Sequence, residues 1–146
     1  MTRKEKALEA FDGGLNCAQS VLLAFAEEMG LDPEKGLKIA SGFGGGMGAM
    51  GGTCGAVTGA FMVIGLGCGN ASAASREAKL ATYGIIQGFA REFEQVHGSI
   101  VCRELLGCDI SSFEGYGEAT KKNLFKTECP RYVETAVVIL ERILGN

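Results

Sequence analysis

The sequence lacks the charge pattern of a nucleic-acid-binding protein. Its 146 residues include 14 Lys and Arg against 17 Asp and Glu, which gives a net charge of −3, and no basic cluster is longer than Arg3-Lys4 or Lys121-Lys122. Binding to a phosphate backbone requires a basic patch or stripe. We therefore expect no nucleic-acid partner.

The sequence also lacks a secretory signal and a long apolar run. Residues 1–9 contain no apolar core and no small-residue cleavage site, so we expect a cytoplasmic location. Residues 39–75 carry no Asp, Glu, Lys or Arg, but glycines interrupt them repeatedly. A membrane-spanning helix needs about 20 consecutive apolar residues. We therefore expect no membrane insertion.

Alternating strand patterns are absent as well. No segment longer than four residues alternates between apolar and polar side chains as a half-buried strand does. Apolar spacings of three and four and end signals such as Asn16 and Pro130 instead predict helices over residues 2–11, 17–29, 33–41, 56–69, 72–97, 99–107 and 130–144. We expect residues 1–146 to form one compact, all-α helical bundle, with a glycine-rich central loop at 42–52, a buried central helix at 56–69 and a loop at 108–115.

The six cysteines form no local metal or redox motif. The closest pair, Cys102 and Cys108, has five residues between its members, and no Cys-x-x-Cys is present. Zinc ribbons, ferredoxin-type clusters and thioredoxin-type sites use such clustered thiols. Any shared site must therefore be assembled by the fold.

Four of the cysteines fall at the predicted starts of helices. They are Cys17, Cys54, Cys102 and Cys129. The positive end of a helix dipole favours thiolate over thiol, so we expect a lowered pKa at these positions. Cys68 falls at a predicted helix end and Cys108 in a loop, so neither is a candidate on this ground. The alternative is that the cysteines pack as small apolar side chains.

Glycine recurs around one of these cysteines. Gly51, Gly55 and Gly59 are spaced by four residues, so within a helix they form a strip without side chains. Gly84 and Gly88 have the same spacing in the following helix and are expected to face that strip. The strip has two interpretations, and both remain open. It either lets two helices pack tightly, or it leaves Cys54 open to the approach of another thiol or a ligand.

Two further features are weaker candidates for a site. His97, the single histidine, could bind a metal or act as a base toward a thiol, but its place at a helix end favours an interaction with the dipole. Residues 44–49 fit G-x-G-x-x-A, the dinucleotide fingerprint, but no predicted strand precedes them. We therefore assign no cofactor from these features.

Three segments around the cysteines carry a family resemblance. They are Asn16-Cys17-Ala-Gln-Ser-Val, Gly51-Gly-Thr-Cys54-Gly-Ala-Val-Thr-Gly59-Ala and Cys102-Arg-Glu-Leu-Leu-Gly107. With them the sequence resembles the C_GCAxxG_C_C family of redox-active proteins over nearly its whole length. The resemblance assigns the first three family cysteines to Cys17, Cys54 and Cys102. It assigns the fourth to Cys129, with Cys108 as the rival, and leaves Cys68 as an extra.

The resemblance implies redox activity without naming a substrate. The leading hypothesis is a thiol–disulfide oxidoreductase in which Cys54 and at least one of Cys17, Cys102 and Cys129 converge and cycle between dithiol and disulfide. The alternative is that the same four cysteines hold an iron–sulfur cluster, haem or zinc; a related region in split-Soret cytochromes keeps cofactor binding open. A third hypothesis is that the chain is a scaffold or partner subunit, in which the cysteines serve only to fill the core. We also expect a homodimer, because one domain of this size covers such an uncharged centre poorly.

Overall fold

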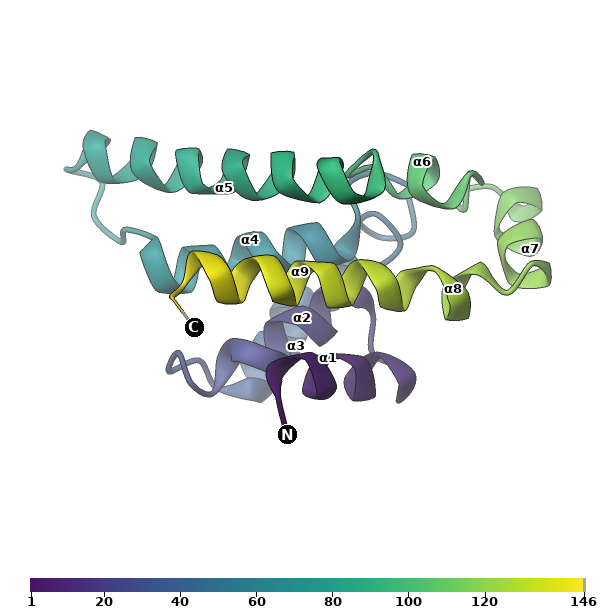
Figure 1. The fold of residues 1–146 in the computed structure, drawn as a ribbon, viewed down its shortest axis with the longest axis horizontal. Coiled ribbons are helices and arrows are strands. Elements are labelled where there is room, and N and C mark those ends of the chain that lie inside the picture. Colours follow the sequence, from purple (N-terminus) through teal and green to yellow (C-terminus); the bar gives the residue numbers. More distant parts are fainter. Residues whose placement is uncertain (146) are drawn as a thin grey trace.

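Helices make up the regular structure of residues 1–145, which the computed structural model describes (Figure 1). They are α1 (Arg3–Asp12), α2 (Cys17–Ala26), α3 (Pro33–Ala40), the 3-10 turn η1 (Ser41–Phe43), α4 (Gly55–Cys68), α5 (Arg76–His97), α6 (Cys102–Leu106), α7 (Phe113–Lys121), α8 (Leu124–Thr127) and α9 (Cys129–Ile143). This part of the chain contains no strand, only an isolated antiparallel bridge between Thr53 and Val101. The predicted all-α class is confirmed.

Side-chain caps fix the helix starts that the sequence predicts. The Asn16 side chain accepts a hydrogen bond from the Gln19 backbone N–H at 2.8 Å, and the Gln19 side chain accepts one from the Asn16 backbone N–H at 3.0 Å. This reciprocal capping box satisfies two backbone donors that the first turn of α2 would otherwise leave unpaired. The box therefore sets Cys17 as the first residue of α2.

The helices are arranged so that several of them start toward one end of the bundle. In Figure 1, α2, α4 and α9 all begin on the side that faces α7 and α8, whereas α5 runs the opposite way across α4 and α9. The core between these helices is filled by large apolar side chains, among them Phe25, Ile64, Phe89, Phe93 and Leu140. The architecture therefore brings helix N-termini from distant parts of the chain together.

The predicted central helix is buried along its first part. In α4 the buried positions include Gly55–Ala60, Val63 and Ile64, while Gly65–Cys68 are exposed. The expectation of a wholly buried helix is wrong for this last turn, which extends beyond the core. No helix within residues 1–145 combines the length and apolarity needed to cross a bilayer.

The glycine strip meets a different helix from the one expected. A Cβ placed on Gly59 would lie 2.7 Å from the Ala18 carbonyl oxygen, so α4 and α2 approach backbone to backbone. Gly84 has no described atom within 4 Å of such a Cβ, so the predicted contact with α5 is wrong. The reason lies in the aromatic side chains between α4 and α5: the rings of Phe61 and Phe89 meet edge to face, with centroids 6.0 Å apart, and hold these helices further apart.

Several boundaries also differ from the prediction: α2 ends at Ala26 rather than at residue 29, α6 begins at Cys102 rather than at residue 99, and α7 and α8 form where no helix was predicted. Two further differences come from serine caps. Ser75 rather than Ser72 caps α5, because its side chain accepts the hydrogen bond from the Ala78 N–H at 3.1 Å while Ser72 closes a local turn. The loop predicted for 108–115 ends early, since the Ser112 side chain accepts from the Gly115 N–H at 2.9 Å and starts α7. Both corrections reflect a choice among several serines that can all cap a helix.

Candidate functional site

Four of the six cysteines line one cavity. Its volume is about 320 Å³, and its wall includes the four predicted site residues, Cys17, Cys54, Cys102 and Cys129. Cys54 is the N-cap of α4, and the other three are the first residues of their helices. The expected convergence at helix starts is confirmed. All six cysteines in residues 1–145 are free.

A short antiparallel backbone pairing holds the segments that carry Cys54 and Cys102 together. The Cys54 N–H donates to the Ile100 carbonyl at 2.7 Å, and the Cys102 N–H donates to the Gly52 carbonyl at 2.6 Å. These bonds flank the bridge between Thr53 and Val101. The segments that lead into α4 and α6 are thereby fixed side by side.

The glycine-rich loop supplies part of the cavity wall with bare backbone. The five residues from Gly45 to Ala49 all have φ between 57° and 72°, a left-handed conformation that favours glycine. A Cβ added to Gly46 would lie 2.8 Å from the Cys102 Cβ and 2.5 Å from the Gly52 nitrogen. Glycine is required here because the backbone itself contacts the thiol-bearing residue.

Burial works against ionisation of two of the thiols. It raises the pKa of Cys54 to about 12, although the backbone N–H groups of Ala56 and Val57 favour its thiolate. Burial raises the pKa of Cys102 to about 11, with a further contribution from Cys129. The expected lowering of the pKa is wrong for both thiols. Burial removes a thiolate from water, and this destabilises the thiolate more than the positive end of the helix dipole stabilises it.

Cys17 and Cys129 are neighbouring thiols on the cavity wall, and their pKa values shift in opposite directions. The interaction with Cys129, followed by burial, raises the pKa of Cys17 well above its usual range. The interaction with Cys17 lowers the pKa of Cys129, although burial opposes this. A negative charge is therefore held more readily by Cys129 than by Cys17. The expected lowering of the pKa is wrong for Cys17; at Cys129 the direction agrees, but the cause is the neighbouring thiol rather than the helix dipole.

The remaining cysteines and the histidine lie outside the cavity wall. Cys108 is buried but interacts with the Glu118 carboxylate, and Cys68 is exposed at the end of α4. Among the two candidates for the fourth family cysteine, Cys129 is the one that lines the cavity. The His97 ring lies 2.7 Å from the Thr135 hydroxyl and packs against Phe93, so it has a structural role.

Aromatic residues complete the wall, and the sequence prediction missed this role. They are Phe11, Tyr116, Phe125 and Tyr132. The Tyr132 hydroxyl donates to the Leu105 carbonyl at 3.1 Å and so links α9 to α6. Tyr132 lies three residues after Cys129 and therefore on the same helix face, which is a signal that could have found it.

A metal site was the alternative use for the four cysteines. Within residues 1–145, no group of three or more His, Cys, Asp or Glu side chains is arranged to hold a metal ion.

Comparison with known proteins gives one match. Residues 15–143 match the family model described as "Putative redox-active protein (C_GCAxxG_C_C)". The matched range contains all four cysteines of the cavity. No curated protein and no solved structure matches the chain.

Proposed function

Because the chain belongs to the C_GCAxxG_C_C family of redox-active proteins, we propose that it is a thiol–disulfide oxidoreductase whose working pair is Cys17 and Cys129. The observation that carries this proposal is that both thiols line one cavity, from the first residues of α2 and α9, and interact there with each other. Two thiols brought together from distant parts of the chain can close a disulfide when their sulfurs meet. The sequence hypothesis placed Cys54 in the redox pair; the present proposal places Cys17 and Cys129 there instead.

The chemistry begins at Cys129. Its thiolate attacks one sulfur of a substrate disulfide R–S–S–R, which forms the mixed disulfide Cys129–S–S–R and releases one RS⁻. Cys17 then attacks the Cys129 sulfur, so that the second RS⁻ leaves, and the proton of Cys17 is transferred to a released thiolate. The substrate disulfide gains two electrons, and the cysteine pair loses two electrons and two protons.

The remaining two thiols line the same cavity but are less suited to the first step. Cys54 and Cys102 lie on either side of the Thr53–Val101 bridge. Their raised pKa values keep them protonated and poor nucleophiles at neutral pH. We therefore assign the attack on the substrate to Cys129 and not to Cys54 or Cys102.

Peptide mapping tests the working pair directly. The reduced protein is treated with a disulfide oxidant at neutral pH, the remaining thiols are alkylated, and the cross-linked peptides are identified by mass spectrometry. We expect the first disulfide to join Cys17 to Cys129. Six alkylated thiols after oxidation, or a first disulfide between two other cysteines, would overturn the assignment.

Matched variants separate this pair from the other cysteines. Cys17→Ser and Cys129→Ser should each abolish formation of the first disulfide. Cys68→Ser and Cys108→Ser change cysteines outside the cavity wall and should leave both its rate and its position unchanged. Loss of the disulfide in these two controls would show that a different pair is used.

Two broader expectations belong to the same proposal. We propose that the protein works in the cytoplasm, where a disulfide of this kind is transient. We also propose a homodimer, supported by Leu80 and Tyr83, which are each 51% exposed on α5 beside the open surface at Gly84. Light scattering tests the homodimer, and a monomeric mass at micromolar concentration would contradict it. Cell fractionation tests the location.

A further inference from the structure

The wall of the cysteine cavity carries no charge. Among the described residues, its lining consists of the four cysteines, apolar and aromatic side chains, Asn16 and bare glycine backbone, with no Lys, Arg, His, Asp or Glu. A volume of about 320 Å³ suits a small molecule rather than a peptide. A charged group inside such a wall would lose its hydration without finding a counter-ion.

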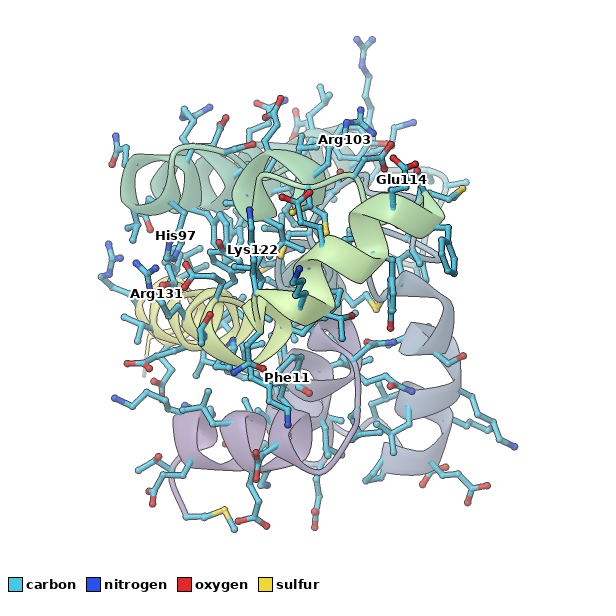
Figure 2. The ribbon with its side chains drawn as sticks, turned by 90° about the vertical axis from the view of Figure 1, so that its right-hand side faces the viewer. Phe11, His97, Arg103, Glu114, Lys122 and Arg131 are labelled. Carbon is cyan, nitrogen blue, oxygen red and sulfur yellow. The ribbon has the colours of Figure 1, made fainter. Side chains whose placement is uncertain are left out.

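Two cations near this end of the bundle are paired with carboxylates. Figure 2 views the end of the bundle where α7 and α8 cross in front, with Lys122 and Arg131 on this face. The Lys122 ammonium lies 2.7 Å from the Glu118 carboxylate, and the Arg131 guanidinium lies 2.8 Å from the Glu128 carboxylate. Both cations are therefore neutralised locally and offer little attraction to an anionic ligand.

Aromatic residues mark where the cavity meets solvent. Tyr116 is 52% exposed, and its ring lies 5.3 Å from that of Phe125. Gly14, which also lines the cavity, is exposed as well. The exposed part of the cavity lining therefore includes an aromatic ring and bare backbone. The raised pKa values of Cys17, Cys54 and Cys102 agree with surroundings that disfavour charge.

We infer that the substrate class of this site is a small, uncharged organic disulfide, and that charged disulfides such as the glutathione dimer are excluded from it. This inference rests on the proposed function, since the substrate is the R–S–S–R that the Cys129 thiolate cleaves. The reaction yields two uncharged RSH molecules and the Cys17–Cys129 disulfide. Its specificity comes from desolvation: only an uncharged R group enters the cavity without losing the hydration of a charge.

Three disulfides of similar size test the inference. They are 2-hydroxyethyl disulfide, which is neutral, cystamine, which is a dication, and dithiodiglycolate, which is a dianion. The rate of Cys17–Cys129 disulfide formation is measured with each and divided by the rate of the same disulfide with free 2-mercaptoethanol, which removes differences in intrinsic reactivity. We expect the neutral compound to be at least tenfold faster than either charged one.

The outcomes distinguish the two proposals. Normalised rates within about threefold of each other, or a faster reaction with a charged compound, would overturn the uncharged substrate class and leave the dithiol chemistry standing. No Cys17–Cys129 disulfide with any of the three would overturn the proposed function itself. The variant Tyr116→Lys, which puts a cation at the exposed rim, should raise the rate of the dianion severalfold relative to the rate of the neutral compound. An unchanged ratio of these two rates in that variant would mean that charge at the rim does not select the substrate, and would overturn the inference.

Discussion

The thiols of Cys17 and Cys129 interact on the wall of one cavity, and their pKa values move in opposite directions because of this interaction. Cys17 becomes harder to deprotonate, while Cys129 holds a negative charge more easily. The two cysteines thus divide the roles of a dithiol: Cys129 supplies the attacking thiolate, and Cys17 retains a proton until the second step.

Replacement of Cys17 by Ala should therefore raise the pKa of Cys129. The thiolate fraction of Cys129 increases as pH rises through its pKa, so loss of the interaction with Cys17 moves this increase to higher pH. The measurement is the rate of Cys129 alkylation by iodoacetamide as a function of pH, followed by peptide mapping. Cys68→Ala is the control and should leave the profile in place. An unchanged midpoint in Cys17→Ala would show that Cys17 does not stabilise the Cys129 thiolate.

The raised pKa of Cys54 predicts a loss of stability in alkaline solution. In the folded protein this pKa is about 12 against a reference value of 9.0, so above pH 9 the unfolded chain gives up a proton that the folded chain keeps. Stability from this group is complete below pH 9 and falls as pH rises from there toward 12. The slope from one such group approaches about 1.4 kcal/mol per pH unit.

Urea unfolding at a series of pH values measures this effect. Between about pH 9 and pH 10, the free energy of unfolding of the wild type should fall more steeply than that of Cys54→Ala, by on the order of 1 kcal/mol. Cys68→Ala changes an exposed cysteine and should keep the steep fall. Equal slopes in the wild type and Cys54→Ala would mean that Cys54 ionises without hindrance in the folded protein.

The sequence predicted most of the helices and the convergence of the four thiols, but not α7, α8 or the chemistry of each thiol. Capping residues and apolar spacing are local signals, so Asn16 places Cys17 at the start of α2 without any knowledge of the rest of the fold. The pKa of Cys54 depends on how much protein surrounds it, and its burial comes from neighbours distant in sequence. The partner of Gly59 was missed for the same reason: spacing shows that a helix face is bare, not which helix covers it.

Two glycines of α4 make a matched test of that close contact. Gly59→Ala places a methyl group 2.7 Å from the Ala18 carbonyl oxygen, and this overpacking should lower the free energy of unfolding by about 1–3 kcal/mol. Gly65→Ala meets no described atom within 4 Å and should raise it by about 0.5–1 kcal/mol through helix propensity. Chemical denaturation of both variants checks the pair. Equal effects of the two substitutions would mean that α2 and α4 are not in backbone contact.

Tyr132 connects the helix that carries Cys129 to the helix that carries Cys102. Its hydroxyl donates at 3.1 Å to the Leu105 carbonyl, one of the last carbonyls of the short helix α6, which lack partners within the helix itself. Tyr132→Phe removes this bond and should lower the free energy of unfolding by about 1 kcal/mol. With α6 less firmly held, the Cys102 N–H, which donates to the Gly52 carbonyl, should exchange with solvent faster. Hydrogen exchange and urea unfolding measure the two effects, with Tyr83→Phe on the exposed face of α5 as the matched control. If the two variants are equally stable and the Cys102 amide exchanges at the same rate in both, then α6 is held against the cavity by apolar packing alone.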